Sequence, residues 1–362
     1  MKYILPHYLT RYYLSYFLFF AVTLMALIYL FDTVELMRRA SKFDNVPLGL
    51  VLQMGLLKLP SFTQTVAPFI ILFAAMATIM QLNRRQELVI LRSAGISAWQ
   101  FLGTLMAGAC FLGCLMVFIL NPLSAMLTNT YYNMNNKFLE RKGSEVAIFD
   151  KGFWLRQPLN KGYLVLNAQK VNWPEKKLEN IIVYNFTADD NFIARYDAEE
   201  AYLGKSAWAL KSVAIHKKAH DPEYRESLQI PTSITQDDIE GSFARPETVS
   251  FWALPQFITT LKATGFDARP QEVYFQYLLA VPFTFITMVL LAACVTLRPP
   301  RDTRAFLFVI VGVLTGFCLF FFSSVLQAFG ISHQLPPVIS AWTPPLITFL
   351  GGVGFLVYNE DG

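Results

Sequence analysis

Six long apolar stretches divide the chain, and each is close to the length of a membrane-crossing helix. A bilayer core of about 30 Å needs about 20 helical residues, which each stretch approaches or exceeds once its flanks are included. One of them contains no charge over Phe306–Val325. A soluble core could bury such a stretch once or twice, so six of them predict a six-span membrane protein. The stretches are Leu14–Leu30, Phe62–Leu82, Phe101–Leu120, Tyr274–Leu297, Ala305–Leu326 and Val338–Val357.

The first stretch is predicted to be a retained membrane anchor. It is too long for a cleaved signal peptide. Phe31–Glu35 follows it, with two acidic residues where a small-residue cleavage site would stand.

The segment between the third and fourth stretches, residues 121–269, has a different pattern. Short apolar runs such as Tyr163–Leu166 and Ile181–Tyr184 are separated by polar turn formers. Regularly spaced short strands are typical of an antiparallel sandwich or jelly roll. We therefore predict a β domain over residues 123–270, including one helix over Phe251–Thr264. The fold class is an α-helical membrane protein with six transmembrane helices and an inserted periplasmic antiparallel β jelly-roll-like domain.

The predicted layout is three spans in residues 1–122, the β domain, and three spans in residues 271–362. Lys and Arg in short loops favour the cytoplasmic side. Placing both termini in the cytoplasm puts most loop arginines there and the β domain outside. The cytoplasmic loop arginines are then Arg84, Arg85, Arg92, Arg298, Arg301 and Arg304. The exception is a basic cluster at the outer end of the first span, formed by Arg38, Arg39 and Lys42.

Composition and motifs narrow the function. Charged residues make up only 15% of the chain, against about 25% in soluble domains. The net charge of +4 is too small to indicate nucleic-acid binding. No phosphate-binding GxxxxGK[ST] loop occurs, so any ATP hydrolysis must come from another subunit. No Asp, Glu or His lies within the apolar stretches, which argues against ion-driven transport. We expect no catalytic residue, cofactor or metal in this chain.

A short charged segment, residues 83–97, joins the second and third stretches. In a helix, Ile90, Leu91 and Ala94 share one face with Glu87, because they follow it by three, four and seven residues. A carboxylate in the middle of an apolar face suits a helix that docks into a partner's groove and meets a cation there. The alternative is a basic loop whose arginines contact lipid headgroups.

Four motifs distributed over nearly the whole chain are specific enough to compare with known families. They are Tyr8–Tyr12 with Phe31–Glu35, Leu59-Pro60 with Ala67-Pro68, Glu87–Ser97, and the ending Leu335–Gly362. Together they resemble the lipopolysaccharide export permeases LptF and LptG, and the ending is more similar to LptG. One departure is that Val66 and Ala67 stand where some relatives have aromatic residues.

The resemblance implies a subunit of a larger machine. Two paralogous permeases, LptF and LptG, pair in the inner membrane of a Gram-negative bacterium, and LptC places one helix at their interface. A cytoplasmic LptB ATPase dimer consumes the ATP. The pair extracts lipopolysaccharide from the outer leaflet, and the periplasmic domains pass it to the LptA bridge toward the outer membrane.

The resemblance also implies site residues. Glu87 is expected to couple the permease to the ATPase, together with Arg84, Ile90, Leu91 and Arg92. The outer basic cluster would bind the phosphates of lipid A, since guanidinium groups pair with phosphate through two hydrogen bonds. Phe317, Phe320 and Phe321 would contact acyl chains. The alternatives are headgroup contacts for the basic residues, and lipid-facing or core packing for the aromatic ones.

Two other functions remain open at this point. One is a permease of similar build for another lipid or a lipoprotein. The other is a membrane-anchored assembly or sensor protein whose β domain binds a partner. The charged segment 83–97 favours a permease, and the basic cluster favours a phosphorylated glycolipid as its substrate.

Overall fold

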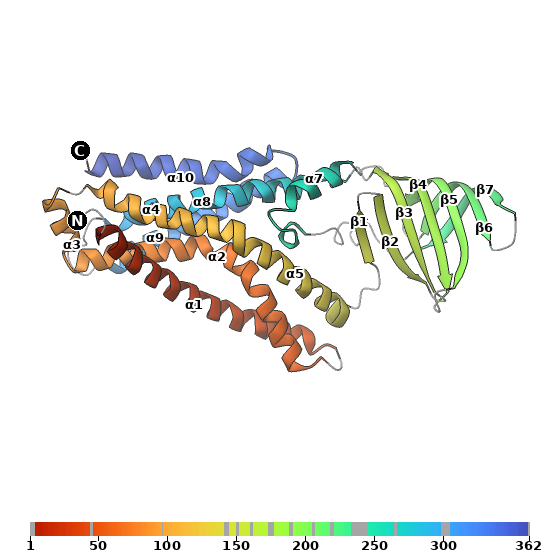
Figure 1. The fold of residues 1–362 in the computed structure, drawn as a ribbon, viewed down its shortest axis with the longest axis horizontal. Coiled ribbons are helices and arrows are strands. Elements are labelled where there is room, and N and C mark those ends of the chain that lie inside the picture. Colours follow the sequence, from red (N-terminus) through yellow and green to blue (C-terminus); the bar gives the residue numbers. More distant parts are fainter. Residues whose placement is uncertain are drawn as a thin grey trace. The chain divides into compact units, whose positions relative to one another are not determined.

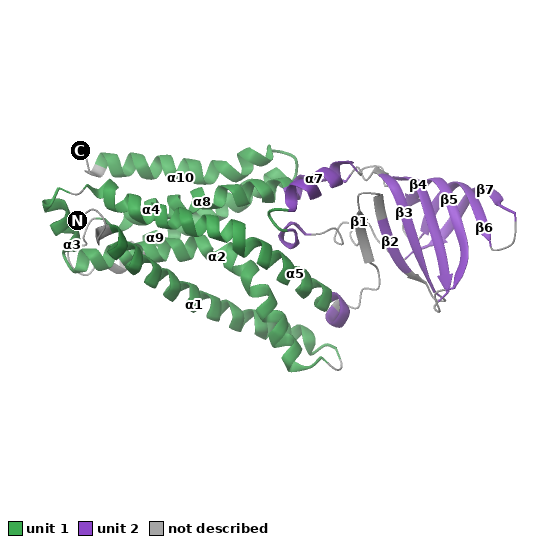
Figure 2. Cartoon of the chain, viewed as in Figure 1, with its two compact units in different colours: residues 1–135, 250–252, 272–362 green, residues 136–249, 253–271 purple. Residues whose placement is uncertain are grey.

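The computed structural model describes most of the chain, in two compact units (Figure 2). Unit 1 comprises residues 1–135, 250–252 and 272–362, and unit 2 comprises residues 136–249 and 253–271. The described residues are 4–43, 46–95, 97–140, 145–149, 152–159, 162–172, 177–187, 191–204, 207–217, 221–232, 245–263, 266–297 and 305–360.

Unit 1 is helical, and six of its described helical stretches are long and apolar enough to cross a membrane. This confirms the prediction of six spans. The helices are α1 (Ile4–Ala40), α2 (Leu48–Arg84), α4 (Ala98–Leu115) continued by a π-helical turn (Met116–Leu120) into α5 (Asn121–Asn135), α8 (Arg269–Thr296), α9 (Ala305–Ile331) and α10 (Pro337–Glu360) (Figure 1). A short helix, α3 (Glu87–Ser93), joins α2 to α4.

Several helices extend well beyond the apolar stretches that predict them. Helices α1 and α2 have 37 residues each, which at 1.5 Å per residue is about 55 Å. Residues 123–135, predicted to begin the β domain, instead continue the third span as α5 and belong to unit 1. The π-helical turn keeps that helix unbroken across Pro122.

The interior of unit 1 is built around α2 and α8. In their most apolar 18-residue windows, 61% and 56% of residues are buried, against none in that window of α1. Pro60 and Pro68 lie inside α2, and Pro282 lies inside α8. A Cβ added at Gly113 of α4 would lie 2.6 Å from Pro282 Cα. Close backbone approach of this kind is typical of packing between membrane helices at small residues.

Unit 2 contains a seven-stranded antiparallel sheet whose described strands pair in chain order. The strands are β1 (Glu145–Phe149), β2 (Gly152–Leu159), β3 (Gly162–Asn172), β4 (Lys177–Thr187), β5 (Phe192–Leu203), β6 (Ala207–Lys217) and β7 (Glu223–Pro231). The predicted inserted antiparallel β domain is therefore confirmed. Its connectivity is a meander and not a jelly roll, because every described strand pairs with its sequence neighbours, without Greek-key crossovers.

Alternate side chains of the strands form one apolar face, which α7 (Leu254–Ala263) covers through Leu261, Phe257 and Ile258. The predicted helix over Phe251–Thr264 is thus present but starts three residues later. Gln157 on β2 donates a hydrogen bond to the Pro231 carbonyl at 2.9 Å and accepts one from the Thr232 hydroxyl at 2.8 Å. Because β2 and β7 are not neighbours in the sheet, these bonds show that the sheet curls around its apolar face.

Candidate functional site

Helix α3 is placed by turns on both sides. Gln86 precedes it with a left-handed φ of 58°, and Gly95 follows it with a φ of 78°. Such values favour glycine, so Gln86 marks a sharply constrained turn directly before Glu87. Ser97 and Gln100 then form a capping box that starts α4. The charged segment therefore contains a defined helix, Glu87–Ser93, between two tight turns.

The carboxylate of Glu87 is held by the N-terminal part of α1. The Tyr8 hydroxyl lies 3.1 Å from both carboxylate oxygens and donates to them. Arg85 Nη1 lies 3.9 Å from Glu87 Oε1 and donates a hydrogen bond of 3.1 Å to the Tyr12 hydroxyl. The rings of Tyr8 and Tyr12 pack edge to face at 4.8 Å. Glu87 is half-buried, so it keeps access to a further partner.

The side chains of α3 point in two directions. Leu88 is buried and Leu91 is half-buried, whereas Val89 and Ile90 are each 63% exposed and Ala94 is exposed. The structure therefore divides the predicted apolar face: Leu91 packs inward with Leu88, and Val89 joins Ile90 on the surface. Val89 and Ile90 thus present a small apolar surface in the connection between two spans. Arg84 and Arg92 are exposed at either end of the segment.

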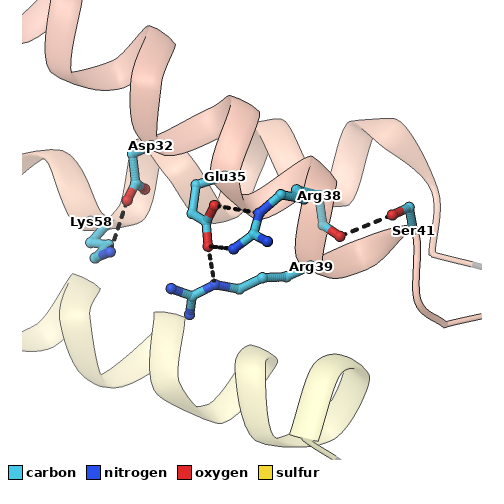
Figure 3. A network of polar contacts seen from close by, with 6 residues as sticks. All are labelled: Asp32, Glu35, Arg38, Arg39, Ser41 and Lys58. Carbon is cyan, nitrogen blue, oxygen red and sulfur yellow. Dashed lines mark hydrogen bonds and ion pairs between the residues drawn. The ribbon is translucent and has the colours of Figure 1, made fainter.

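At the other end of α1, Glu35 binds both predicted arginines (Figure 3). Arg38 contacts its carboxylate through Nε at 2.8 Å and Nη2 at 2.9 Å, and Arg39 contacts it through Nε at 2.9 Å. Both guanidinium groups are exposed, as is Lys42. The structure thus brings Arg38 and Arg39 together on one carboxylate, within one turn of helix.

A second charged pair lies nearby, and sequence reasoning missed it. Lys58 Nζ of α2 is 2.9 Å from Asp32 Oδ1 of α1 (Figure 3). The ammonium also lies over the rings of Phe62 and Tyr131, at 4.6 and 5.5 Å from their centroids. The side chains are only 14% (Asp32) and 28% (Lys58) exposed. Charged residues inside membrane helices are expensive and often functional, so a lone lysine on an apolar helix is the signal that could have found the pair.

The three candidate phenylalanines of α9 do not form one surface. Phe317 and Phe321 lie one turn apart and are exposed. Phe320 is half-buried, and its ring is 5.5 Å from that of Phe69 in α2. Phe320 therefore contributes to packing between α9 and α2, and only the other two present their rings outward.

A buried polar node joins the two groups of spans. The Asn121 amide, fully buried, donates to Gln64 Oε1 of α2 at 3.0 Å and to the Tyr274 hydroxyl of α8 at 2.9 Å. Its oxygen accepts from the Phe251 backbone N–H at 2.8 Å. Asn121 thus ties α2, α5, α8 and residues 250–252 together inside unit 1.

The β domain has a cavity of about 320 Å³ along its curled sheet, within the range of small-ligand pockets. Tyr196, Ile215 and Leu228 provide apolar walls, and Lys217 and Arg225 add positive charge. Glu223 pairs with Arg225 at 2.6 Å. The Arg225 guanidinium therefore holds the pKa of the Glu223 carboxyl below its usual range. The cavity combines apolar and cationic groups, as an amphiphilic anion would require.

Six described helices long and apolar enough to span a membrane, an inserted antiparallel β domain and a short helix between two of the spans define a multi-pass membrane protein. Comparison with known families assigns it more narrowly. The family model "Lipopolysaccharide export system permease LptF/LptG" matches residues 7–358, and the chain belongs to this family.

Individual relatives agree with this assignment. The chain is 24% identical over 296 residues to the lipopolysaccharide export system permease protein LptG of Haemophilus influenzae, covering 80% of this chain and 81% of the relative. It is 22% identical over 347 residues to the protein of the same name from Escherichia coli (strain K12), covering 92% and 91%. The chain is thus most like LptG, a transmembrane permease of the inner membrane.

Proposed function

We propose that this chain is the permease subunit of an ATP-driven exporter that extracts lipopolysaccharide from the outer leaflet of the inner membrane. The β domain, on the periplasmic side, would pass the lipid toward the outer membrane. Both termini and α3 would lie in the cytoplasm. The observation that carries the proposal is α3 itself: a defined short helix, in the loop between two spans, with two exposed apolar side chains beside a carboxylate.

In this proposal, coupling to a separate ATPase would use that surface. Val89 and Ile90 would fill an apolar groove of an LptB-like ATPase dimer, and Glu87 would meet a cation there. Arg84 and Arg92 would contact the ATPase at the edges of this surface. Leu91 would hold α3 in place by packing against unit 1. The ATPase would use the ATP, so this chain needs no cofactor of its own.

Substrate binding would use the outer end of α1. Arg38, Arg39 and Lys42 carry three positive charges there, and exposed guanidinium groups suit the phosphates of lipid A. Phe317 and Phe321 would contact acyl chains, with Phe320 packed behind them. The cavity of the β domain, apolar with cationic residues, would receive part of the same lipid after extraction.

The remaining partners in this proposal are those that the resemblance to the family implies. The chain would pair with the paralogous permease LptF, receive one helix of LptC, and deliver lipopolysaccharide to an LptA bridge. No nucleic acid takes part in this scheme.

The direct test is purification of the tagged chain from its native membranes, followed by reconstitution in proteoliposomes. We expect an ATPase and lipopolysaccharide to copurify, and we expect lipopolysaccharide to change the rate of ATP hydrolysis. Copurification of an ATPase with a different lipid would indicate a permease for another substrate. Recovery of neither would favour an assembly or sensor protein whose β domain binds a partner.

A further inference from the structure

Helix α1 carries both candidate sites, one near each end. Tyr8 binds the coupling carboxylate, and Arg38 and Arg39 lie some thirty residues further along the same uninterrupted helix. At 1.5 Å per residue, about 45 Å separates the two ends. A rigid helix of this length can transmit a displacement from one end to the other without any intermediate chain of contacts.

The burial of α1 is uneven along its length. Its deepest residues lie toward its ends: Leu9 and Tyr13 near one end, and Leu36 near the other. The most apolar window between them contains no buried residue. Between its ends α1 lies at the surface of unit 1 and contacts α2 on one side, for example through the rings of Phe20 and Phe73 at 5.7 Å. The polar contacts near its two ends, of Tyr8 with Glu87 and of Asp32 with Lys58, link α1 to α3 and to α2.

At the end near α3, two tyrosines on adjacent turns of α1 make the polar contacts to the coupling segment. Tyr8 donates to both oxygens of Glu87, and Tyr12 accepts from Arg85. The contact between Tyr8 and Glu87 joins residues 79 positions apart and reaches the very carboxylate that sits beside the exposed pair Val89 and Ile90. Hydrogen bonds to an ionised carboxylate are stronger than neutral ones. A displacement of Glu87 would therefore pull on α1 through Tyr8.

We propose that Tyr8 is the positioning residue that links the coupling segment to α1, and through α1 to the substrate end of the permease. This inference rests on the proposed function, because it assigns Glu87 a second task besides meeting the ATPase. Tyr8 fixes where the carboxylate points, and α1 moves when an ATPase cation shifts that carboxylate. Tyr12 and Arg85 guide the same movement from the neighbouring turn.

The test compares Tyr8→Phe with Tyr13→Phe. Both remove one hydroxyl from α1, but the Tyr13 hydroxyl is buried without a hydrogen-bond partner among the residues that the structure describes. In the reconstituted complex we measure the amount of bound ATPase and the ratio of ATP hydrolysis with lipopolysaccharide to that without it. We expect Tyr8→Phe to keep the ATPase bound while that ratio falls several-fold toward one, and Tyr13→Phe to keep the wild-type ratio.

A double-mutant cycle and hydrogen exchange complete the test. If Tyr8 and Glu87 act through their hydrogen bond, the double variant Tyr8→Phe with Glu87→Gln should have the same ratio of ATP hydrolysis with and without lipopolysaccharide as Glu87→Gln alone. In the purified chain, Tyr8→Phe should accelerate amide exchange in residues 87–93 several-fold, and Tyr13→Phe should not. An unchanged ratio in Tyr8→Phe, or unchanged exchange in this segment, overturns the inference. If lipopolysaccharide does not change the rate of ATP hydrolysis by the wild-type complex, the proposed function is refuted. The hydrogen-exchange measurement then tests the role of Tyr8 by itself.

Discussion

Asp32 of α1 and Lys58 of α2 form an ion pair of 2.9 Å that joins the two helices. The second carboxylate oxygen of Asp32 is buried and has no hydrogen-bond partner among the residues described. Phe62 and Tyr131 enclose the ammonium from two further directions. A pair with this little solvent contact fixes the position of α1 against α2, next to Arg38 and Arg39 (Figure 3).

Removing one partner of this pair should destabilise unit 1. Breaking a fully buried ion pair costs about 3–5 kcal/mol, and because Lys58 keeps some solvent contact we expect about 1–3 kcal/mol for Lys58→Met. The double variant Asp32→Leu with Lys58→Met should be more stable than Lys58→Met alone, since it leaves no unpaired charge. Thermal unfolding in detergent measures both, with Lys42→Met at the exposed end of the same region as control. Equal losses in the single and double variants would contradict this account.

The Glu35 carboxylate should weaken substrate binding by occupying Arg38 and Arg39. Glu35→Gln removes the negative charge and leaves two guanidinium groups available to phosphate, so we expect tighter binding of diphosphorylated lipid A. Arg38→Gln with Arg39→Gln should bind it at least tenfold more weakly, which corresponds to about 1.4 kcal/mol. Lipid titration of the reconstituted permease gives the affinities. A gain in Glu35→Gln that persists unchanged at 0.5 M salt would argue against an electrostatic origin.

Local patterns of apolar and polar residues made much of this fold predictable. The length of the apolar stretches predicts six spans, and the alternation between Tyr163 and Tyr184 predicts the inserted β strands, because both signals are local in sequence. The ends of the helices are harder to predict from the sequence. Residues 123–135 are polar enough to resemble a domain boundary, but they continue the third span as α5.

The site could be predicted only in part, because its geometry depends on residues distant in sequence. Glu87 was found from its apolar neighbours, but its bond to Tyr8 spans 79 positions and has no local signal. Helical periodicity alone does not decide which side of α3 faces the other helices. Leu91, expected on the outward face, is half-buried, whereas Val89 is exposed. Asp32 and Lys58 lie outside the apolar stretches and therefore escaped the search for charges within spans.

The exposed pair on α3 should carry most of the ATPase affinity. A buried aspartate opposite an apolar groove is unfavourable, so Ile90→Asp should lower the amount of copurified ATPase at least tenfold, as expected for a central interface residue. Val89→Asp should act similarly. Leu48→Asp changes an equally exposed apolar residue at the opposite end of α2 and should have no effect. Normal copurification of Ile90→Asp would exclude this surface as the docking site.

Acid should weaken the β domain through Glu200. The Lys177 ammonium at 2.7 Å, and then the Tyr202 hydroxyl, hold the pKa of Glu200 below its usual range. A lowered folded-state pKa contributes stability above the unfolded value of about 4.3 and loses it as the pH falls through the folded value. We expect protection of β4 and β5 against hydrogen exchange to fall between pH 6 and pH 3, by less in Glu200→Gln. Glu199→Gln, at the exposed neighbouring position, should follow the wild type. An identical acid response in Glu200→Gln would contradict the assignment.

The Asn121 node should contribute strongly to the association of the two groups of spans. Asn121→Ala removes the acceptor of the Phe251 N–H and leaves Gln64 Oε1 with only the longer hydrogen bond from the Tyr274 hydroxyl at 3.5 Å among the contacts described, and a buried unsatisfied group costs about 1–3 kcal/mol. Asn121→Leu keeps a similar side-chain volume but has no amide. If the hydrogen bonds dominate, it should destabilise unit 1 as much as Asn121→Ala does. If the lost side-chain volume dominates, it should destabilise unit 1 clearly less. Thr130→Ala in the same helix removes an exposed hydroxyl bonded to the Met126 carbonyl and serves as control. Thermal unfolding of the purified chain ranks the variants. Because α2, α5 and α8 meet at Asn121, loss of the node should also release residues 250–252 to hydrogen exchange before the helices themselves open.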